Sequence, residues 1–174
     1  DPEWEAFLQE VTTHETFLFR DKPHWDWIQG TFLPDLSAQV KAGTRAPTLR
    51  VWSAACSTGD EATSVACCAA DRLTPLADWK IDIVGTDVGC GAVAAARQGV
   101  FSERAVRLVP ESMRKRFFDR DPGGQGWTSK QLLRKMLRFS THNLLEPLRE
   151  APFDLVLLKN VLIYFDAASK KKVL

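Results

Sequence analysis

Hydrophobic positions follow different spacings in different parts of this chain. Near the start they recur every three to four residues, which predicts amphipathic helices. The residues in this pattern are Trp4, Phe7, Leu8 and Val11, followed by a second series within His24–Val40. Further along, short apolar runs alternate with helical segments. The runs predict strands at Leu49–Ala54, Ile81–Asp87, Leu137–Ser140 and Phe153–Leu158. The intervening segments predict helices at Glu61–Leu73, Ala92–Gln98 and Pro110–Phe118.

Strands that alternate with helices are typical of an α/β fold with an open, mostly parallel sheet covered by helices. The Phe153–Leu158 run is apolar almost throughout, which predicts a strand buried on both faces. In such sheets ligands bind beyond the carboxyl ends of the strands. The residues that follow each strand are therefore the first candidates for function.

Composition narrows the class of protein. A chain of 174 residues with 45% hydrophobic and 26% charged residues fits a single globular domain. A net charge of +1 excludes the strongly basic surface of a non-specific nucleic-acid binder. No apolar run reaches the roughly 20 residues that span a bilayer, and no signal peptide is recognisable. We expect a cytoplasmic protein that does not insert into the membrane. The 4 cysteines form no CxxC pair and the 3 histidines are widely spaced, so no metal site is predicted.

Polar and small residues follow the first two predicted strands. The loop Ser53–Gly59 permits a close backbone approach to a ligand before a helix N-terminus, and Asp87 can accept both hydroxyls of a ribose. Each feature also has an ordinary explanation as a helix cap. The loop lacks G-x-G-x-x-G, and Asp87 lies further from Gly59 than the roughly 20 residues of a dinucleotide fingerprint. A ligand with one ribose and no pyrophosphate, S-adenosylmethionine, fits this pattern better.

The last predicted strand is followed by Lys159–Asp166. Asn160 and Tyr164 can offer hydrogen bonds to a substrate there, whereas Val161, Ile163 and Phe165 are expected in the core.

Four sequence blocks, in order, resemble the CheR family of chemotaxis receptor methyltransferases, which methylate receptor glutamates with S-adenosylmethionine. The blocks are Thr13–Arg20, Val51–Gly59, Asn143–Leu145 and Phe153–Asp154 with Asn160–Phe165. The resemblance implies a Rossmann-like methyltransferase fold. It places the end of an N-terminal helical domain or linker at 1–11, and a catalytic domain without the family's last strands at 12–174. It also implies a small subdomain at about 119–136. The length and glycines of the turn there allow a hairpin, but the flanking residues do not alternate cleanly, so peptide docking is not supported.

The resemblance also implies site residues. Those expected to bind the cofactor are His14, Thr16, Arg20, Glu61, Asp87, Asn143, Leu144, Lys159 and Asn160, and those expected to act in catalysis are Arg20 and Tyr164. Several positions depart from the family pattern: His14 replaces Asn, Lys159 replaces Arg, and Asp60 and Ala62–Thr63 replace Glu and Pro-Tyr.

The implied function is methyl-ester formation on glutamate side chains of a chemoreceptor cytoplasmic domain or a similar coiled-coil sensor. Basic residues expected on a helix can face such an acidic partner, although a solvated helix face is the commoner explanation; they are Arg104, Arg107, Arg114, Lys115 and Arg116. The departures from the family leave a different class open, a non-catalytic module that binds S-adenosylmethionine or acts as a scaffold. A methyltransferase for nucleic acids or small molecules is the weakest alternative.

Overall fold

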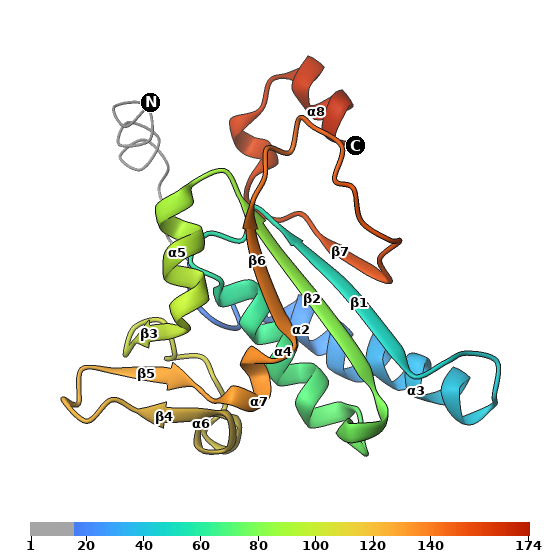
Figure 1. Ribbon diagram of the computed structural model, residues 1–174, viewed down its shortest axis with the longest axis vertical. Coiled ribbons are helices and arrows are strands. Elements are labelled where there is room, and N and C mark those ends of the chain that lie inside the picture. Colours follow the sequence, from blue (N-terminus) through green and yellow to red (C-terminus); the bar gives the residue numbers. More distant parts are fainter. Residues whose placement is uncertain (1–15) are drawn as a thin grey trace.

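Figure 1 shows the computed structural model, in which residues 16–174 are described. The predicted helix around Trp4–Val11 lies outside these residues. The centre of the fold is a four-stranded sheet in the order β6-β2-β1-β7. Its strands are β1 (Thr48–Ala54), β2 (Lys80–Asp87), β6 (Leu137–Thr141) and β7 (Leu155–Leu157). All three pairings are parallel, so the prediction of an α/β fold with a parallel sheet is confirmed.

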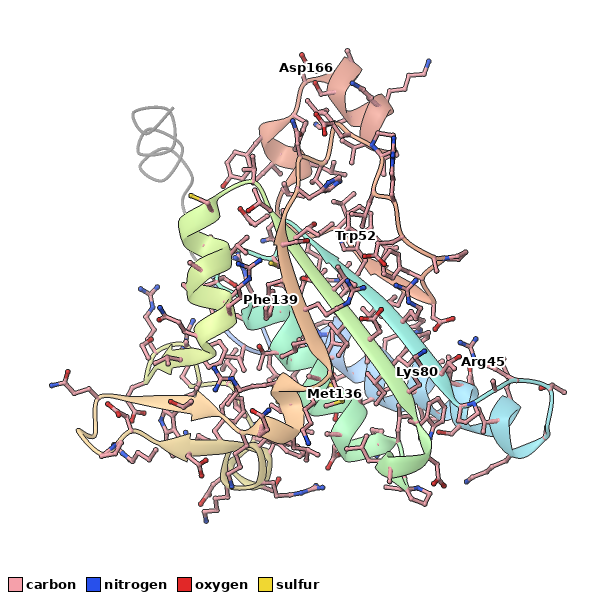
Figure 2. The ribbon with its side chains drawn as sticks, viewed as in Figure 1. Arg45, Trp52, Lys80, Met136, Phe139 and Asp166 are labelled. Carbon is pink, nitrogen blue, oxygen red and sulfur yellow. The ribbon has the colours of Figure 1, made fainter. Side chains whose placement is uncertain are left out.

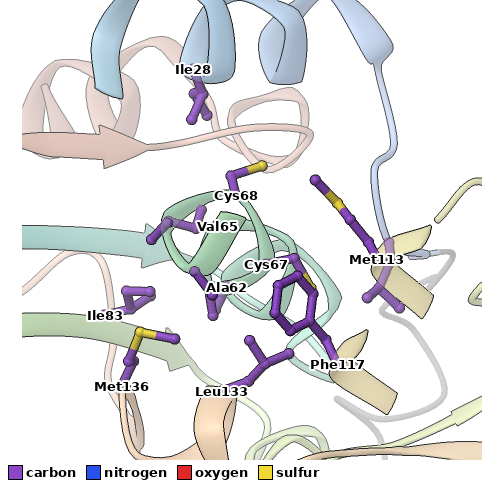
Figure 3. Packing of buried hydrophobic residues seen from close by; sticks show 14 of the residues in the cluster. Ile28, Ala62, Val65, Cys67, Cys68, Ile83, Met113, Phe117, Leu133 and Met136 are labelled. Carbon is purple, nitrogen blue, oxygen red and sulfur yellow. The ribbon is translucent and has the colours of Figure 1, made fainter. Parts of the chain in front are cut away.

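Helix α4 (Asp60–Arg72) runs between β1 and β2 in sequence and packs behind the sheet together with α2 (Lys22–Trp27) and α3 (Leu33–Lys41) (Figure 1). Every residue from Ala62 to Ala70 is buried, because α4 lies between the sheet and the other helices. Its side chains there are small, which permits close packing on both sides. Figure 3 shows Val65, Cys67 and Cys68 of α4 among the apolar side chains of its neighbours.

The apolar series predicted as one helix over His24–Val40 is interrupted. A π-helical turn, Ile28–Phe32, separates α2 from α3, and the amide of Leu33 donates to the carbonyl of Ile28. Pro34 follows directly and has no amide hydrogen to continue the regular ladder. The extra residue in the turn was not predicted from the spacing of apolar side chains.

A second, antiparallel sheet follows α5 (Cys90–Gln98), in the order β3-β5-β4. Its strands are β3 (Val100–Ser102), β4 (Phe118–Arg120) and β5 (Gly126–Ser129). The turn whose length and glycines allow a hairpin does join two antiparallel strands, β4 and β5, which are too short to show clean alternation. The unit expected at 119–136 overlaps this sheet, whose first strand begins earlier, and its standing as a subdomain stays a prediction.

The helices around this sheet differ in part from expectation. Helices α6 (Glu111–Phe117) and α7 (Gln131–Arg134) flank β4 and β5 in sequence. Arg104 and Arg107 lie in turns before α6, so their placement on a helix was wrong, whereas Arg114–Arg116 are helical. The remaining elements are short: η2 (Leu76–Asp78), η3 (Leu162–Tyr164) and α8 (Ala167–Val173). Among residues 16–174, no helix has the length and apolar character needed to cross a bilayer.

Strand β7 forms one edge of the parallel sheet. It pairs with β1 alone, and Val156 at its centre is 48% exposed, whereas Leu157 is buried. The prediction that the Phe153–Leu158 run is buried on both faces was therefore wrong for its outward-facing residue. An apolar run of this length does not distinguish a central strand from an edge strand.

Candidate functional site

A cavity of about 480 Å³ opens at the carboxyl ends of the four parallel strands. Every predicted site residue within the described part of the chain lines it. These residues are Thr16, Arg20, Glu61, Asp87, Asn143, Leu144, Lys159, Asn160 and Tyr164. His14 lies outside the described residues. The structure therefore brings together side chains that come from five separate segments of the sequence, although their individual roles remain predictions.

The Asp87 carboxylate at the end of β2 is held by two backbone amides. The amide of Ser57 donates to Oδ2 at 2.8 Å and that of Gly89 donates to Oδ1 at 2.9 Å. Asp87 is only 7% exposed, so its orientation is fixed. A carboxylate oxygen accepts more than one hydrogen bond, and both oxygens therefore keep capacity for hydroxyl groups of a ligand.

The turn after β1 has an unusual backbone. Ala55, Ser57 and Gly59 have positive φ angles of 57°, 50° and 85°. The amide of Cys56 donates to the Thr86 carbonyl at 2.8 Å, which fastens the middle of the turn to β2. A Cβ atom on Gly59 would lie 2.9 Å from Ala96 of α5, so a larger residue would also collide there. The small residues predicted to permit close backbone approach thus also permit the turn itself.

Glu61, in the first turn of α4, is held on both oxygens. The Ser53 hydroxyl donates to Oε1 at 2.7 Å, and Lys159 Nζ lies 3.7 Å from Oε2. Burial raises the pKa of the Glu61 carboxyl, against the opposing effects of Ser53, Lys159 and His24. Lys159 Nζ also lies 3.2 Å from Asp21 Oδ2. The Lys159 ammonium therefore bridges the carboxylates of Asp21 and Glu61.

Arg20 reaches the cavity from the segment that precedes α2. Phe19 and Asp21 on either side of it have positive φ angles of 58° and 63°. The Arg20 carbonyl accepts hydrogen bonds from Trp25 Nε1 at 2.6 Å and from Lys159 Nζ at 3.3 Å. Its guanidinium carbon lies 5.7 Å from the centre of the Phe17 ring, which also lines the cavity.

Asn143 and Leu144 follow β6 in a tight turn. The amide of His142 donates to the Asp87 carbonyl at 2.9 Å, and that of Leu145 donates to Asn143 Oδ1 at 3.0 Å. The main chain of this segment is thereby tied to the end of β2, beside the Asp87 carboxylate.

The mouth of the cavity is apolar and open to solvent. Val88, Ile163 and Tyr164 line it and are 46%, 73% and 65% exposed. Val161, Ile163 and Phe165 were expected in the core, and that expectation was wrong because all three line the cavity. The chain turns away from the sheet after β7, with Asn160 at a φ of 57°, so these side chains do not continue the strand.

Other lining residues were not predicted, among them Phe17, Trp25 and His142. Trp25 is buried and indistinguishable by type from a core residue, so only the fold reveals its position. Cys56 lines the cavity from within the predicted loop Ser53–Gly59. Among residues 16–174, no group of three His, Cys, Asp or Glu side chains gathers in a way that can hold a metal ion.

The sequence of residues 14–174 matches the family described as CheR methyltransferase, SAM binding domain. The chain belongs to this family. One relative is a probable chemotaxis protein methyltransferase of Rhizobium etli, which is 32% identical over 95% of this chain and 62% of its own length. Another is chemotaxis protein methyltransferase 1 of Pseudomonas aeruginosa, which is 35% identical over 98% of this chain and 62% of its own length. The chemotaxis protein methyltransferase of Escherichia coli is 32% identical over 99% of this chain and 58% of its own length. This chain of the CheR family thus spans less than two thirds of the length of these relatives.

Among solved structures, the methyltransferase domain of bacterial CtHen1-C aligns with a TM-score of 0.41 and 14% identity, over 82% of this chain and 56% of that chain. This likeness is too weak to add to the assignment, which rests on the family match.

Proposed function

We propose that this chain carries the catalytic domain of a protein-glutamate O-methyltransferase. It transfers a methyl group from S-adenosylmethionine to glutamate side chains on the cytoplasmic domain of a chemoreceptor or a similar coiled-coil sensor. One observation carries the proposal: the residues that match the family's motifs converge on a single cavity at the carboxyl ends of the parallel strands. The names of the relatives, all chemotaxis protein methyltransferases, support the same process.

The cavity fits S-adenosylmethionine in size and in chemistry. Its volume of about 480 Å³ falls within the range of roughly 300–1,000 Å³ for small-molecule sites. We assign Asp87 to the two ribose hydroxyls, because it lines the cavity and both of its oxygens keep capacity for further hydrogen bonds. We assign Glu61 to the ammonium end of the cofactor or to the backbone near it. Thr16, Asn143, Leu144 and Asn160 also line the cavity and are assigned to further polar and apolar contacts with the cofactor. When bound, S-adenosylmethionine supplies an electrophilic methyl group on a positively charged sulfur.

The remaining chemistry requires little from the protein beyond positioning. A glutamate side chain with a pKa of about 4.3 is already ionised near pH 7, so no general base is needed. Arg20 provides a cation for the incoming carboxylate or for the carboxylate of the cofactor. Tyr164, at the mouth of the cavity, orients the substrate oxygen. The product is a methyl ester, and S-adenosylhomocysteine is released.

The mouth of the cavity favours a macromolecular substrate. Exposed apolar side chains beside an active site are typical of protein-binding surfaces, and Val88, Ile163 and Tyr164 form such a rim. Arg107 is exposed nearby, with its guanidinium carbon 3.8 Å from the centre of the Phe17 ring. Apolar and basic groups side by side suit an acidic residue carried on a polypeptide surface.

Incubation with methyl-labelled S-adenosylmethionine and receptor cytoplasmic fragments tests the proposal. We expect a label on the receptor that mild base releases, as methyl esters require, and its loss when the target glutamates are changed to alanine. Tight cofactor binding without any base-labile label would contradict catalysis and favour a non-catalytic module that senses S-adenosylmethionine.

A further inference from the structure

Helix α4 carries one buried hydroxyl that connects two distant parts of the chain. Ser64 is completely buried, and its Oγ donates to the Asp60 carbonyl at 2.7 Å within the helix. The same Oγ accepts the backbone amide of Phe19 at 2.9 Å, although the two residues lie 45 positions apart in the sequence. A serine hydroxyl inside a helix can be satisfied by donating to the carbonyl four residues earlier. The hydrogen bond that Ser64 accepts from the Phe19 amide is additional to that one. Ser64 therefore links α4 to the segment that carries Arg20.

That segment needs external support. Phe19 and Asp21 both adopt positive φ angles, a conformation that non-glycine residues take only at a cost of about 1 kcal/mol or more each. The Arg20 carbonyl between them is held by Trp25 Nε1 and Lys159 Nζ. The amide of Phe19 is held by Ser64. The hydroxyl of Ser64 thus fixes the beginning of the turn, and the two carbonyl contacts fix its middle.

We infer that Ser64 is a positioning residue for Arg20. By holding the Phe19 amide, it keeps the left-handed turn in place and the Arg20 side chain directed into the cavity. Ser64 does not line the cavity and acts only through this turn. The effect on cofactor binding rests on the proposed function, whereas the effect on the turn does not.

The test compares Ser64→Ala with a matched control. Ser129→Ala also removes a buried serine hydroxyl that donates to a backbone carbonyl, that of Gly99 at 3.2 Å, but Ser129 lies in β5 and its hydroxyl bonds outside the turn. Ser64→Thr keeps a hydroxyl at the same position. Hydrogen exchange of individual amides, followed by NMR, reports the turn directly. The amide of Leu18, which donates to Ala105, serves as an internal reference.

In Ser64→Ala we expect the Phe19 amide to exchange at least tenfold faster, while the exchange rate of the Leu18 amide is unchanged. The Phe19 amide loses a hydrogen bond whose contribution corresponds to about a tenfold change in an equilibrium constant. Ser129→Ala should leave both rates as in the unaltered chain, and Ser64→Thr should restore protection. Calorimetric titration with S-adenosylhomocysteine should show a dissociation constant raised about tenfold in Ser64→Ala only.

An unchanged Phe19 exchange rate in Ser64→Ala, or equal acceleration in Ser129→Ala, would overturn the inference. If Ser64→Ala does not fold, the unaltered chain decides: a Phe19 amide that exchanges as fast as an unstructured one contradicts the role of Ser64, and a protected one supports it. If the unaltered chain binds no S-adenosylhomocysteine, the proposed function fails, but the exchange experiment still tests the turn.

Discussion

The backbone amide of Ser57 donates a hydrogen bond of 2.8 Å to Oδ2 of Asp87, so the turn after β1 is fastened to the end of β2. The two strands are direct neighbours, with Ala54 opposite Thr86, and their ends therefore meet at the same edge of the sheet. This contact aligns a carboxylate and a left-handed turn on one wall of the cavity before any ligand arrives. Orientation in advance reduces the free-energy cost of ordering the site on binding.

Replacement of Asp87 should weaken cofactor binding. Asp87→Ala removes the proposed partner of the ribose hydroxyls and the carboxylate that accepts the Ser57 amide, which should reduce the binding free energy of S-adenosylhomocysteine by about 1–3 kcal/mol. Asp78→Ala, at an exposed site just before β2 begins, is the matched control and should bind as the unaltered chain does. Calorimetric titration measures both, and equal dissociation constants for the two variants would remove Asp87 from the binding site.

Much of the parallel sheet could be predicted because its elements carry strong local signals. The runs that became β1 and β2 are apolar and bounded by small or polar residues, so their positions differ from prediction by one residue at most. The antiparallel sheet lacked such a signal. β4 has only 3 residues, and its pairing depends on the turn around Gly124, where φ is 69°, rather than on alternation. Likewise, the apolar spacing could not reveal the π turn before Pro34.

Gly85 in β2 should tolerate no side chain. A Cβ atom there would lie 2.5 Å from Phe139 Cδ1 and 3.0 Å from Cys56 Sγ. Phe139 of β6, labelled in Figure 2, covers this position. Gly85→Ala should reduce the free energy of unfolding by about 1–3 kcal/mol through overpacking and displace Cys56 beneath the Ser57 turn.

Gly30→Ala supplies the comparison. Gly30 lies in the π turn. Apart from its chain neighbours and the nearby backbone of its own helix, no atom lies within 4 Å of the position that a Cβ atom would take there, so alanine should be neutral or stabilise by up to about 1 kcal/mol. Urea unfolding measures the free energy of unfolding of Gly85→Ala and Gly30→Ala. Equal stabilities would show that the space above Gly85 is not filled as described.

Acid should weaken the charged network in which Arg50 and Arg138 pair with Asp82 and Glu150. Hydrogen bonds from Arg138 and then Arg50 lower the pKa of Asp82 below its ordinary value. A carboxyl with a lowered folded-state pKa contributes stability above its unfolded pKa of about 3.9 and loses it as the pH falls through the folded pKa. Asp82→Asn should therefore cost about 1–2 kcal/mol at pH 7 and lose less stability than the unaltered chain on acidification. Asp78→Asn is the control, because Asp78 forms no ion pair within residues 16–174. Urea unfolding at several pH values measures the free energy of unfolding of each variant. If this free energy falls with pH equally in Asp82→Asn and in the unaltered chain, the role of the network is contradicted.

Glu61 should show the opposite dependence on pH. Burial raises the pKa of its carboxyl, so the folded state binds the proton more tightly than the unfolded state does. The associated stability is present below the unfolded pKa of about 4.3 and is lost as the pH rises through the folded pKa. Glu61→Gln should abolish this loss while reducing the binding free energy of S-adenosylhomocysteine by about 1–3 kcal/mol. Unfolding at pH 4 and pH 7 together with calorimetry tests both effects, and a variant that binds normally would place Glu61 in a structural role alone.

The candidate site was predictable where sequence motifs mark it and not where tertiary contacts create it. Asp87 is the last residue of β2 and Asn160 comes shortly after β7, and polar residues at strand ends are a signal visible in the sequence. Ser64 lies in a run of small residues inside α4, and only the fold shows that its hydroxyl meets the Phe19 amide. Ile163 resembles a core residue by type, yet it is exposed because the chain leaves the sheet after β7.

A crystal structure of this chain with S-adenosylhomocysteine tests the central claim most directly. We predict the nucleoside in the cavity lined by Glu61, Asn143 and Tyr164, with both ribose hydroxyls within hydrogen-bond distance of the Asp87 carboxylate. A ligand bound elsewhere, or a ribose turned away from Asp87, would contradict it.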